Sequence, residues 1–507
     1  MIPSMDFALM GPELILIAAG IFVLLADAFV PREHGKDDPR GDVNDPRSLT
    51  LGITLVGLLA AAGYLCLGRG DTTVAQTTFE GLFIVDAFGD AFKLVALAGT
   101  ILGVLLSDTW LKNQRLPTGA FYALVLFATT GMLYLLSATD MVMLFVGLEL
   151  MSIPLYCLAA ALRWDDRSVE AGVKYLVLGS FATAVMLMGF ALLYAFVGIH
   201  TGAATTRLDL VAQAVMEAQA AGSLPGYALM GGLLALVGLL FKMSAVPFHM
   251  WTPDVYEGAP TSITAWMSVS VKAVTAAVML RVFGAPLLEA LQLDGILWVI
   301  AALTMFLGNT MALTQDNVKR MLAYSSVAHG GYMLVGILAG GDAGSAAVLF
   351  YAAAYTFGNI AAFAVLVFLS RAGHEVETFS DLSGLGQKMP LLGVVMLLSM
   401  LSLMGMPPLA GFFGKFAIFR AAVSEGYVVL TIIGVLTSAI SVAYYLRPVI
   451  VMFMKEPAEG AEIATGRAWS VRTALVVAVV VTVLLGLMPS GTLDYALESA
   501  QALASNL

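Results

Sequence analysis

The chain has 507 residues, of which 60% are hydrophobic and only 12% are charged, and its mean hydropathy is +0.90. A soluble domain holds about 45–50% apolar and about 25% charged residues, so this composition excludes an ordinary soluble protein and is typical of a polytopic membrane protein. The net charge of −10 adds little, because the orientation of membrane helices depends on where Lys and Arg lie.

Apolar stretches long enough to cross a membrane follow one another along the chain. A crossing helix needs about 20 mostly apolar residues, and the stretches predict about fourteen such helices. The polar stretches 31–48, 199–225 and 454–469 are loop-sized, so no segment remains for a soluble domain. The first ten residues lack Lys and Arg, which favours a permanent first span over a cleaved signal peptide. The predicted spans are 11–30, 49–67, 84–106, 116–136, 138–162, 170–198, 226–248, 260–283, 295–314, 321–340, 343–370, 391–422, 427–453 and 470–489.

The basic residues gather in alternate loops. One set of loops holds most of them, whereas the other holds little beyond Arg69 and Arg207. The positive-inside rule predicts that the basic set is cytoplasmic, and an even number of spans then puts both termini on the periplasmic side. The basic set comprises Arg32, Lys36, Arg40, Arg47, Lys112, Arg115, Arg163, Arg167, Lys319, Arg320, Arg371, Lys388, Arg447, Lys455 and Arg467.

Proline interrupts the seventh and twelfth predicted spans. In the seventh, Lys242 precedes Pro247, and in the twelfth, Pro407 and Pro408 precede Lys415. Proline removes a backbone donor, and such a break survives in lipid only where protein or a water-filled cavity satisfies the freed groups. Broken helices in corresponding positions of two halves indicate a transport site.

The order of lysine and proline is mirrored between these two spans, which lie five helices apart and enter the membrane from opposite sides. This mirrored order predicts an all-α fold with two inverted five-helix repeats in one integral membrane domain, 1–507. We expect three N-terminal helices in 1–115, a first repeat of helices 4–8 in 116–283, an inverted second repeat of helices 9–13 in 295–453, and a last helix and tail in 470–507.

Several charged residues lie inside predicted spans. A charge at the centre of a membrane helix costs roughly 2.5–3.5 kcal/mol, so several together cost on the order of 10 kcal/mol, comparable with the folding free energy of a domain. Pairing, hydration or loss of charge must offset this cost. The charged residues are Glu149, Lys93, Lys174, Lys242, Lys272 and Lys415.

These residues allow structural and functional interpretations. Glu149 is either half of a structural ion pair or a proton-carrying carboxylate with a movable lysine partner. Lys272, at the centre of its span, is either structural or a proton store, since desolvation lets a buried lysine lose its charge. Lys242 and Lys415, beside the broken helices, have the same two interpretations. Lys174 lies near a span end, where snorkelling or a simple ion pair is favoured.

Three further positions are less distinctive. Lys93 has Asp86 and Asp90 nearby in sequence, which places it at the interface. His329, in "AYSSVAHGGYML", is either a packing histidine or a residue that passes protons between waters, because the histidine pKa is near physiological pH. His249 is comparable, as a gate on the cytoplasmic side.

Motifs for redox chemistry and nucleotide hydrolysis are missing from the sequence. It holds no GxGxxG in a strand–helix setting, no Walker motif and no cysteine cluster, since Cys66 and Cys157 stand singly in apolar segments. We therefore expect no nucleotide, flavin, haem, zinc or iron–sulfur site, and a chain that moves charge without redox chemistry of its own.

Three segments carry a family resemblance over nearly the whole chain. "KMSAVPFHMWTPDVYEGAPTSITAWM", "LAYSSVAHGGYMLVG" and "MPPLAGFFGKFAIF" resemble the antiporter-like subunits of respiratory complex I, which are related to the large subunits of multisubunit cation/proton antiporters. Among these subunits the first segment is most similar to the N type of bacterial NADH–quinone oxidoreductase, equivalent to mitochondrial ND subunit 2. The M type has glutamate where this chain has Lys415, and the L type continues into a long lateral helix.

The resemblance implies two inverted five-helix repeats with broken seventh and twelfth helices, and a proton route along the middle plane of the membrane. Glu149 and Lys242 would form the coupling pair, Lys272 the central relay, and Lys415 the step toward the periplasm. Quinone reduction elsewhere would open or close the coupling pair, and the charge on Lys242 would then alter the proton affinity of Lys272. Lys174 and His329 match positions that line the same axis.

In this family NADH, FMN, the iron–sulfur clusters and quinone are bound by other subunits, so the resemblance implies no cofactor in this chain. The implied partners are the other membrane subunits of complex I, including neighbouring antiporter-like and small subunits, and the lipid bilayer, with no nucleic acid. The implied location is the bacterial inner membrane.

Three alternatives remain open on the sequence. The chain could belong to an antiporter that exchanges sodium for protons without electron transfer. It could be a membrane subunit of an energy-converting hydrogenase or a related ferredoxin-linked complex. It could also be a non-transporting scaffold, for which the buried lysines would not matter to transport.

Overall fold

The computed structural model describes residues 6–29, 46–67, 75–114, 116–370, 375–456 and 469–504. In these ranges the regular structure is helical except for an antiparallel hairpin of β1 (Gln76–Thr78) and β2 (Phe83–Val85). The first helices are α1 (Gly11–Phe29), α2 (Pro46–Leu67), α3 (Ala87–Gln114), α4 (Gly119–Ser137), α5 (Met141–Ala159), α6 (Asp166–Thr201), α7 (Leu208–Ala220), α8 (Gly226–Lys242), α9 (Trp251–Gly258) and α10 (Thr261–Val282). The remainder are α11 (Ala285–Ala290), α12 (Asp294–Leu313), α13 (Val318–Ala339), α14 (Gly341–Leu369), α15 (Leu385–Lys388), α16 (Pro390–Met404), α17 (Ala410–Ser424), α18 (Val428–Met454), α19 (Trp469–Leu487) and α20 (Pro489–Ala504).

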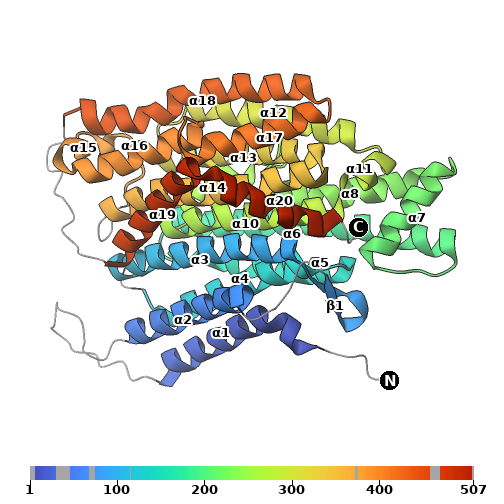
Figure 1. Cartoon of the computed structure of the whole chain (residues 1–507). Coiled ribbons are helices and arrows are strands. Elements are labelled where there is room, and N and C mark those ends of the chain that lie inside the picture. Colours follow the sequence, from blue (N-terminus) through green and yellow to red (C-terminus); the bar gives the residue numbers. More distant parts are fainter. Residues whose placement is uncertain are drawn as a thin grey trace.

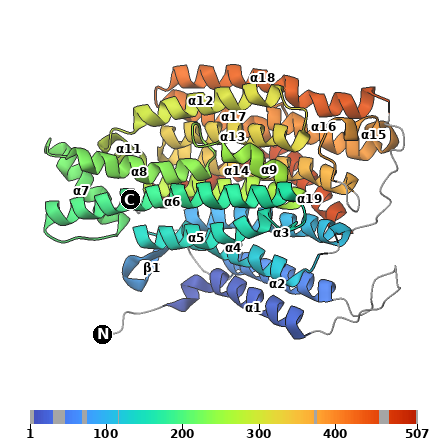
Figure 2. The ribbon, with the colours of Figure 1, turned by 180° about the vertical axis from the view of Figure 1, so that it is seen from behind.

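The long helices form one bundle and lie mostly along a common direction, horizontal in Figure 1. Twelve helices of the described ranges are long and apolar enough to cross a membrane. Together with two broken spans, α8–α9 and α16–α17, they account for all fourteen predicted spans, so the predicted all-α polytopic fold is confirmed. α7, α11 and β1 lie at one end of the bundle, and α15 lies at the other end (Figures 1 and 2).

Several elements outside the spans were not predicted from the sequence, including α7, the hairpin β1–β2 and α20. The stretch 199–225, expected to be a loop, contains the helix α7. This helix is too polar to cross a membrane, but its apolar residues recur every three or four positions and cover one face. The hairpin β1–β2 precedes the third span, and α20 occupies the predicted tail. The buried residues of α7 are Val211, Ala214, Val215 and Ala218.

Two helices, α10 and α13, are enclosed by the rest of the bundle. Every residue of the most apolar window of each is buried, although both are rich in serine and threonine or in glycine and tyrosine. In Figure 1 both run through the middle of the bundle. Because lipid does not reach these helices, they can carry polar side chains at membrane depth.

The first break separates α8 from α9, and the surrounding protein satisfies its backbone groups. The amide of Val246 donates to Thr304 Oγ1 on α12 at 2.9 Å. The indole nitrogen of Trp251 donates to the carbonyl oxygen of Phe241 at 3.1 Å. These bonds meet the requirement that non-helical backbone at membrane depth be satisfied within the protein.

The second break separates α16 from α17, and a lysine satisfies part of it. Lys415 Nζ donates to the carbonyl oxygen of Met404, the last residue of α16, at 3.0 Å. Gly405 follows with φ +90°, a left-handed conformation that favours glycine at a helix end. A Cβ at this glycine would lie 3.0 Å from Lys415 Cδ. The lysine therefore ends the first half-helix in one break and lies in the second half-helix in the other, which is the predicted mirrored order.

Candidate functional site

The predicted central residue, Lys272, lies in the middle of α10 and is only 1% exposed. Its Nζ donates to the carbonyl oxygen of Ser326 on α13. Within the described part of the chain, no carboxylate forms an ion pair with this lysine. Gly330 lets α13 approach the backbone that follows α8, because a Cβ there would lie 2.7 Å from the carbonyl oxygen of Met243. Lys272 thus sits in the bundle centre with a carbonyl partner and no counter-charge, so its ammonium form is not locked in place.

Lys242, at the end of α8, is surrounded by aromatic rings. Its Nζ lies 5.0 Å from the ring centroid of Tyr175, 5.2 Å from that of Tyr156 and 5.7 Å from that of Phe241. We refer to these three side chains as the aromatic cage. Trp251 stacks on Tyr175 with ring centroids 4.5 Å apart, and this contact restricts the orientation of the Tyr175 ring. Each ring within about 6 Å of a cation contributes roughly 0.5–2 kcal/mol of attraction.

The predicted coupling pair, Glu149 and Lys242, is not joined by an ion pair in the described chain. Lys242 Nζ instead lies 3.4 Å from the hydroxyl oxygen of Tyr156. Tyr156 follows Glu149 on α5 by seven residues, about two helical turns, and so shares its face of the helix. A Cβ at Gly179 on α6 would overlap the Tyr156 hydroxyl, so this glycine provides the space for the ring. The ammonium therefore rests in the aromatic cage, with Glu149 apart from it.

Lys415, on α17, is 5% exposed. Besides the carbonyl of Met404, its Nζ donates to Ser438 Oγ on α18 at 2.8 Å. It lies 4.8 Å from the ring centroid of Tyr332 on α13. The environment resembles that of Lys242 in offering a hydroxyl and an aromatic face, whereas the carbonyl contact is found only at Lys415.

His329 lies between the central lysine and α18, buried on α13. One ring nitrogen contacts the hydroxyl of Tyr351 at 2.6 Å, and the other contacts that of Tyr445 at 2.9 Å. Tyr445 also shares a hydrogen bond with Ser325. A histidine held between two hydroxyls can accept a proton on one side and donate on the other.

A second pair of tyrosines extends this polar region toward Lys415. The amide nitrogen of Asn309 donates to the Tyr332 hydroxyl at 3.2 Å, and the Tyr444 hydroxyl donates to the Asn309 oxygen at 2.9 Å. Tyr332 is the ring that faces Lys415. The four tyrosines Tyr332, Tyr351, Tyr444 and Tyr445, which we call the tyrosine cluster, therefore occupy the region between His329 and Lys415.

Lys174 differs from the three buried lysines because its side chain is 39% exposed. It forms ion pairs with Glu170 at 2.7 Å and Asp254 at 2.8 Å. Asp254 in turn pairs with Arg320 at 2.8 Å. The simple ion pair that the sequence favoured is present. His249 lies in the first break, half-buried, and its Nδ1 has no hydrogen-bond partner in the described protein.

Lys93 is completely buried, and its ion-pair partner is not a neighbour in sequence. Its Nζ lies 2.6 Å from Glu13 Oε1 on α1. Asp86, which the sequence placed beside this lysine, forms its ion pair with Arg281 on α10 at 2.8 Å. The first pair joins α3 to α1, and the second joins the residue before α3 to α10, so Lys93 lies in the protein interior.

Several buried polar side-chain atoms have no hydrogen-bond partner in the described protein. Buried polar groups are nearly always hydrogen-bonded, and water supplies the partner where the protein does not. These atoms lie in the first break and on α9, α10, α13 and α14. They are Ser244 Oγ, Thr252 Oγ1, Ser262 Oγ, Ser326 Oγ, Tyr355 Oη and Asn359 Oδ1.

The sequence analysis missed the tyrosines on both sides of the central lysine. A signal was present, because tyrosine in membrane helices is expected near the interfaces, whereas Tyr332, Tyr351 and Tyr445 lie well within predicted spans. A tyrosine at that depth needs a partner for its hydroxyl. The described residues include no cluster of three metal-ligating side chains, and Cys66 and Cys157 are both free and exposed.

Comparison with known proteins gives a consistent relationship. Residues 138–441 match the family model described as NADH:quinone oxidoreductase/Mrp antiporter, transmembrane. The chain is 43% identical to "NADH-quinone oxidoreductase subunit N" of Trichlorobacter lovleyi, covering 97% of this chain and 96% of that protein. It is 40% identical to the protein of the same name from Rhodospirillum rubrum, with the same two coverages.

Solved structures share the fold. A chain of respiratory complex I from Thermus thermophilus with bound aureothin is 33% identical and superposes with a TM-score of 0.78, covering 95% of this chain and 98% of that chain. A chain of the archaeal membrane-bound sulfane sulfur reductase superposes with a TM-score of 0.84 at 22% identity, covering 98% of both chains. A chain of the Mrp complex from Dietzia has a TM-score of 0.78 at 21% identity, covering 98% of this chain and 97% of that chain. The last two similarities concern the fold alone.

Proposed function

Because the chain belongs to the family of NADH-quinone oxidoreductase N subunits, we propose that it moves protons across the membrane within that complex. The oxidation of NADH and the reduction of quinone take place in other subunits, and this subunit converts the released free energy into proton transfer. The full-length identity of 43% to a curated N subunit supports the assignment. The observation that carries the mechanism is the set of three buried lysines on α8, α10 and α17 that form no ion pair with a carboxylate of the described residues.

In this proposal each buried lysine holds and releases one proton at its Nζ. Glu149 modulates Lys242, Lys272 is the central relay, and Lys415 is the outermost step. The mirrored breaks support this order, because Lys242 and Lys415 lie on opposite sides of their breaks and each contacts a hydroxyl and an aromatic ring. Lys174 and His249 line the route less closely, since Lys174 is exposed and ion-paired.

Charge on Lys242 acts on Lys272 through electrostatics. When Glu149 draws the ammonium out of the aromatic cage, the positive charge near α10 changes, and with it the proton affinity of Lys272. An ion pair of Glu149 and Lys242 at about 4 Å would be worth about 4 kcal/mol at an effective dielectric of 20, so making or breaking it can shift the proton affinity of Lys242 by about three orders of magnitude. His329 and the tyrosine cluster provide hydroxyls and a ring that can pass a proton from Lys272 toward Lys415.

We assign the bundle end that carries α15 to the cytoplasm. Lys112 at the end of α3, Lys319 at the start of α13 and Arg447 near the end of α18 support this assignment, since cytoplasmic ends are rich in Lys and Arg. α1 then begins, and α20 ends, on the periplasmic side of a bacterial inner membrane. In this orientation the proposed route takes up protons from the cytoplasmic side and releases them on the periplasmic side.

The domain division rests on the same symmetry. We propose that α4–α10 form the first repeat and α12–α18 the inverted second repeat, with α1–α3 and α19–α20 added at the two ends of the chain. NADH, FMN, iron–sulfur clusters and quinone belong to other subunits, and the partners of this chain are the neighbouring membrane subunits and lipid.

Purification of the tagged chain from its native membrane tests the assignment. We expect flavin, iron–sulfur clusters and NADH–quinone activity to copurify. Nickel with hydrogenase activity would assign it to an energy-converting hydrogenase, and sodium-driven proton exchange without flavin would assign it to an antiporter. Either outcome would contradict the proposal.

A further inference from the structure

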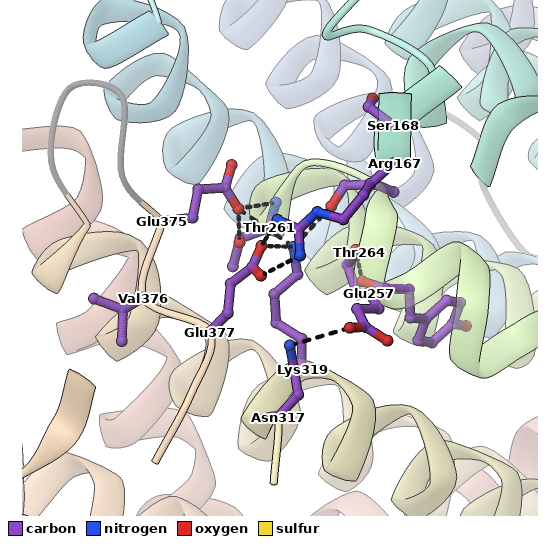
Figure 3. A network of polar contacts seen from close by, with 12 residues as sticks. Arg167, Ser168, Glu257, Thr261, Thr264, Asn317, Lys319, Glu375, Val376 and Glu377 are labelled. Carbon is purple, nitrogen blue, oxygen red and sulfur yellow. Dashed lines mark hydrogen bonds and ion pairs between the residues drawn. The ribbon is translucent and has the colours of Figure 1, made fainter. Parts of the chain in front are cut away.

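The enclosed helix α10 is held at each end by buried charged residues. At its first residue, the Glu375 carboxylate accepts from the Thr261 amide at 3.3 Å and lies 3.3 Å from Lys319 Nζ (Figure 3). At its last turn, Arg281 forms an ion pair with Asp86, the residue before α3, at 2.8 Å. The helix that carries the central lysine is therefore fixed in position at both of its ends.

The pair Asp86–Arg281 is tightly constrained. Arg281 Nη1 donates to Asp86 Oδ2 and Nη2 donates to Oδ1, each at 2.8 Å, and such bidentate pairs have a fixed geometry. The guanidinium carbon lies 5.5 Å from the ring centroid of Phe88. A Cβ at Gly89 would lie 3.2 Å from Arg281 Nη2, so the first turn of α3 packs directly against the pair. The guanidinium therefore has little freedom to move.

A cavity of about 880 Å³ lies beyond this pair, at the bundle end that carries α7, α11 and β1. Its walls include Arg281 and its two neighbours on α10, Leu280 and Val282. Asp86 is not among the described wall residues. The cation of the pair thus borders the cavity, and its carboxylate partner lies behind it.

The other charged residues on the cavity wall are closer to solvent than Arg281. Its side chain is 6% exposed, whereas three of the four wall carboxylates are exposed and the fourth is half-buried. The cavity therefore carries carboxylates on its solvent side and a buried cation where it meets α10. The other charged wall residues are Glu80, Arg207, Asp209, Asp342 and Glu425.

The cavity wall comes close to the central lysine. Arg281 follows Lys272 by nine residues on α10, which corresponds to about 13 Å at about 1.5 Å per residue. Every residue of α10 between them is buried, and the hydroxyl of Thr275 donates to the carbonyl oxygen of Val271 at 2.7 Å. In the proposed orientation this cavity is on the periplasmic side, which pumping makes acidic. Protons that passed Arg281 could return to Lys272 and dissipate the gradient.

We propose that Arg281, held by Asp86, is the barrier that keeps periplasmic protons from returning to Lys272. Arginine stays protonated at physiological pH, and a fixed arginine in a pore excludes protons and other cations by repulsion. Asp86 acts as the positioning residue, because it offsets the cost of burying the guanidinium and holds it against the cavity. The inference rests on the proposed function and adds a barrier against reverse flow.

The test removes the charges of the pair and keeps its shape. The double variant Asp86→Asn/Arg281→Gln leaves no unpaired charge buried, so we expect it to assemble. Asp86→Arg/Arg281→Asp keeps an ion pair but puts the carboxylate, not the cation, on α10. The matched control is Arg207→Gln/Asp209→Asn, which neutralises the exposed ion pair on the same cavity wall.

Passive proton flux is measured without NADH, in proteoliposomes that hold the purified complex and an imposed pH gradient. Both variants of the Asp86–Arg281 pair should raise the flux at least about ten-fold, since even part of the interaction between two unit charges in a protein corresponds to one order of magnitude. The control should match the unsubstituted complex. Addition of Lys272→Met to Asp86→Asn/Arg281→Gln should abolish the extra flux. During turnover, that double variant should keep NADH–quinone activity and acidify inverted vesicles less.

Unchanged flux in either assembled variant of the pair would overturn the barrier. So would an equal rise in the control, or extra flux that persists with Lys272→Met. Because this flux needs no redox reaction, it is separate from pumping during turnover. If the flux stays unchanged while Lys272→Met alone abolishes pumping, the barrier is wrong and the proposed function stands. If Lys272→Met alone pumps normally, the proposed function itself is wrong.

Discussion

Lys242 Nζ lies 3.4 Å from the hydroxyl oxygen of Tyr156 and 5.2 Å from the centroid of its ring. Tyr156 is on the same face of α5 as Glu149, the residue proposed to pair with Lys242. One helix, α5, thus offers the ammonium two alternative partners: the Glu149 carboxylate in the proposed paired position, and Tyr156, as one side of the aromatic cage, in the observed position. Because the cage attraction is about 0.5–2 kcal/mol per ring, it can hold the lysine without preventing its return to Glu149.

Tyr156→Leu should disturb this balance. Loss of the ring removes one face of the cage and favours the Glu149 position by about 1 kcal/mol, roughly a five-fold change in the equilibrium. We expect quinone turnover and proton pumping to fall by a similar factor in inverted vesicles. Tyr156→Phe keeps the ring and should retain most of the activity. Equal loss in both variants would mean that the hydroxyl, and not the cage, positions Lys242.

Glu149→Gln should lower quinone turnover and proton pumping together. Removal of the carboxylate leaves Lys242 in the aromatic cage permanently, because a neutral amide cannot compete for the ammonium as an anion does. We expect NADH–quinone turnover and acidification to fall at least about ten-fold, since a pair at 4 Å is worth about 4 kcal/mol at an effective dielectric of 20. Glu149→Asp keeps the charge and serves as the control. Normal pumping by an assembled Glu149→Gln complex would contradict the coupling scheme.

The buried pair Lys93–Glu13 makes a prediction about stability. Lys93→Met removes the ammonium 2.6 Å from the Glu13 carboxylate, and breaking a buried ion pair costs about 3–5 kcal/mol. We expect a clearly lower unfolding temperature of the purified complex or loss of this subunit on a native gel. The double variant Lys93→Met/Glu13→Leu removes both charges and should recover most of the stability. If the double variant is no more stable than Lys93→Met alone, the pair does not account for the effect.

The membrane helices could be predicted because an apolar run of sufficient length has few other structures open to it in lipid. Lys242, Lys272 and Lys415 stood out for the same reason, since a charge within such a run is costly. The prolines marked the two breaks. The mirrored position of the lysine relative to each break could therefore be predicted from the sequence alone.

Contacts between residues distant in sequence were not predictable in this way. Lys93 was placed with Asp86, a neighbour in sequence, whereas its partner Glu13 lies 80 residues away. Glu375 lies in a polar segment that resembles any loop. Its contacts with α3, α10 and α13 appear only in the folded chain, where these three helices meet around it. The tyrosines carry no charge, so a hydropathy argument overlooks them, although their hydroxyls occupy the region between the lysines.

The most direct test of the account is substitution of Lys272, the lysine at the centre of the bundle. Lys272→Met removes the exchangeable proton, and Lys272→Arg keeps a charge that does not dissociate at physiological pH. After assembly is verified on a native gel, NADH–quinone turnover and acidification of inverted vesicles are measured. The account predicts that both variants assemble and that both lose turnover and pumping together. Normal turnover and pumping in the assembled variants would show that Lys272 is structural, and that protons do not pass through it.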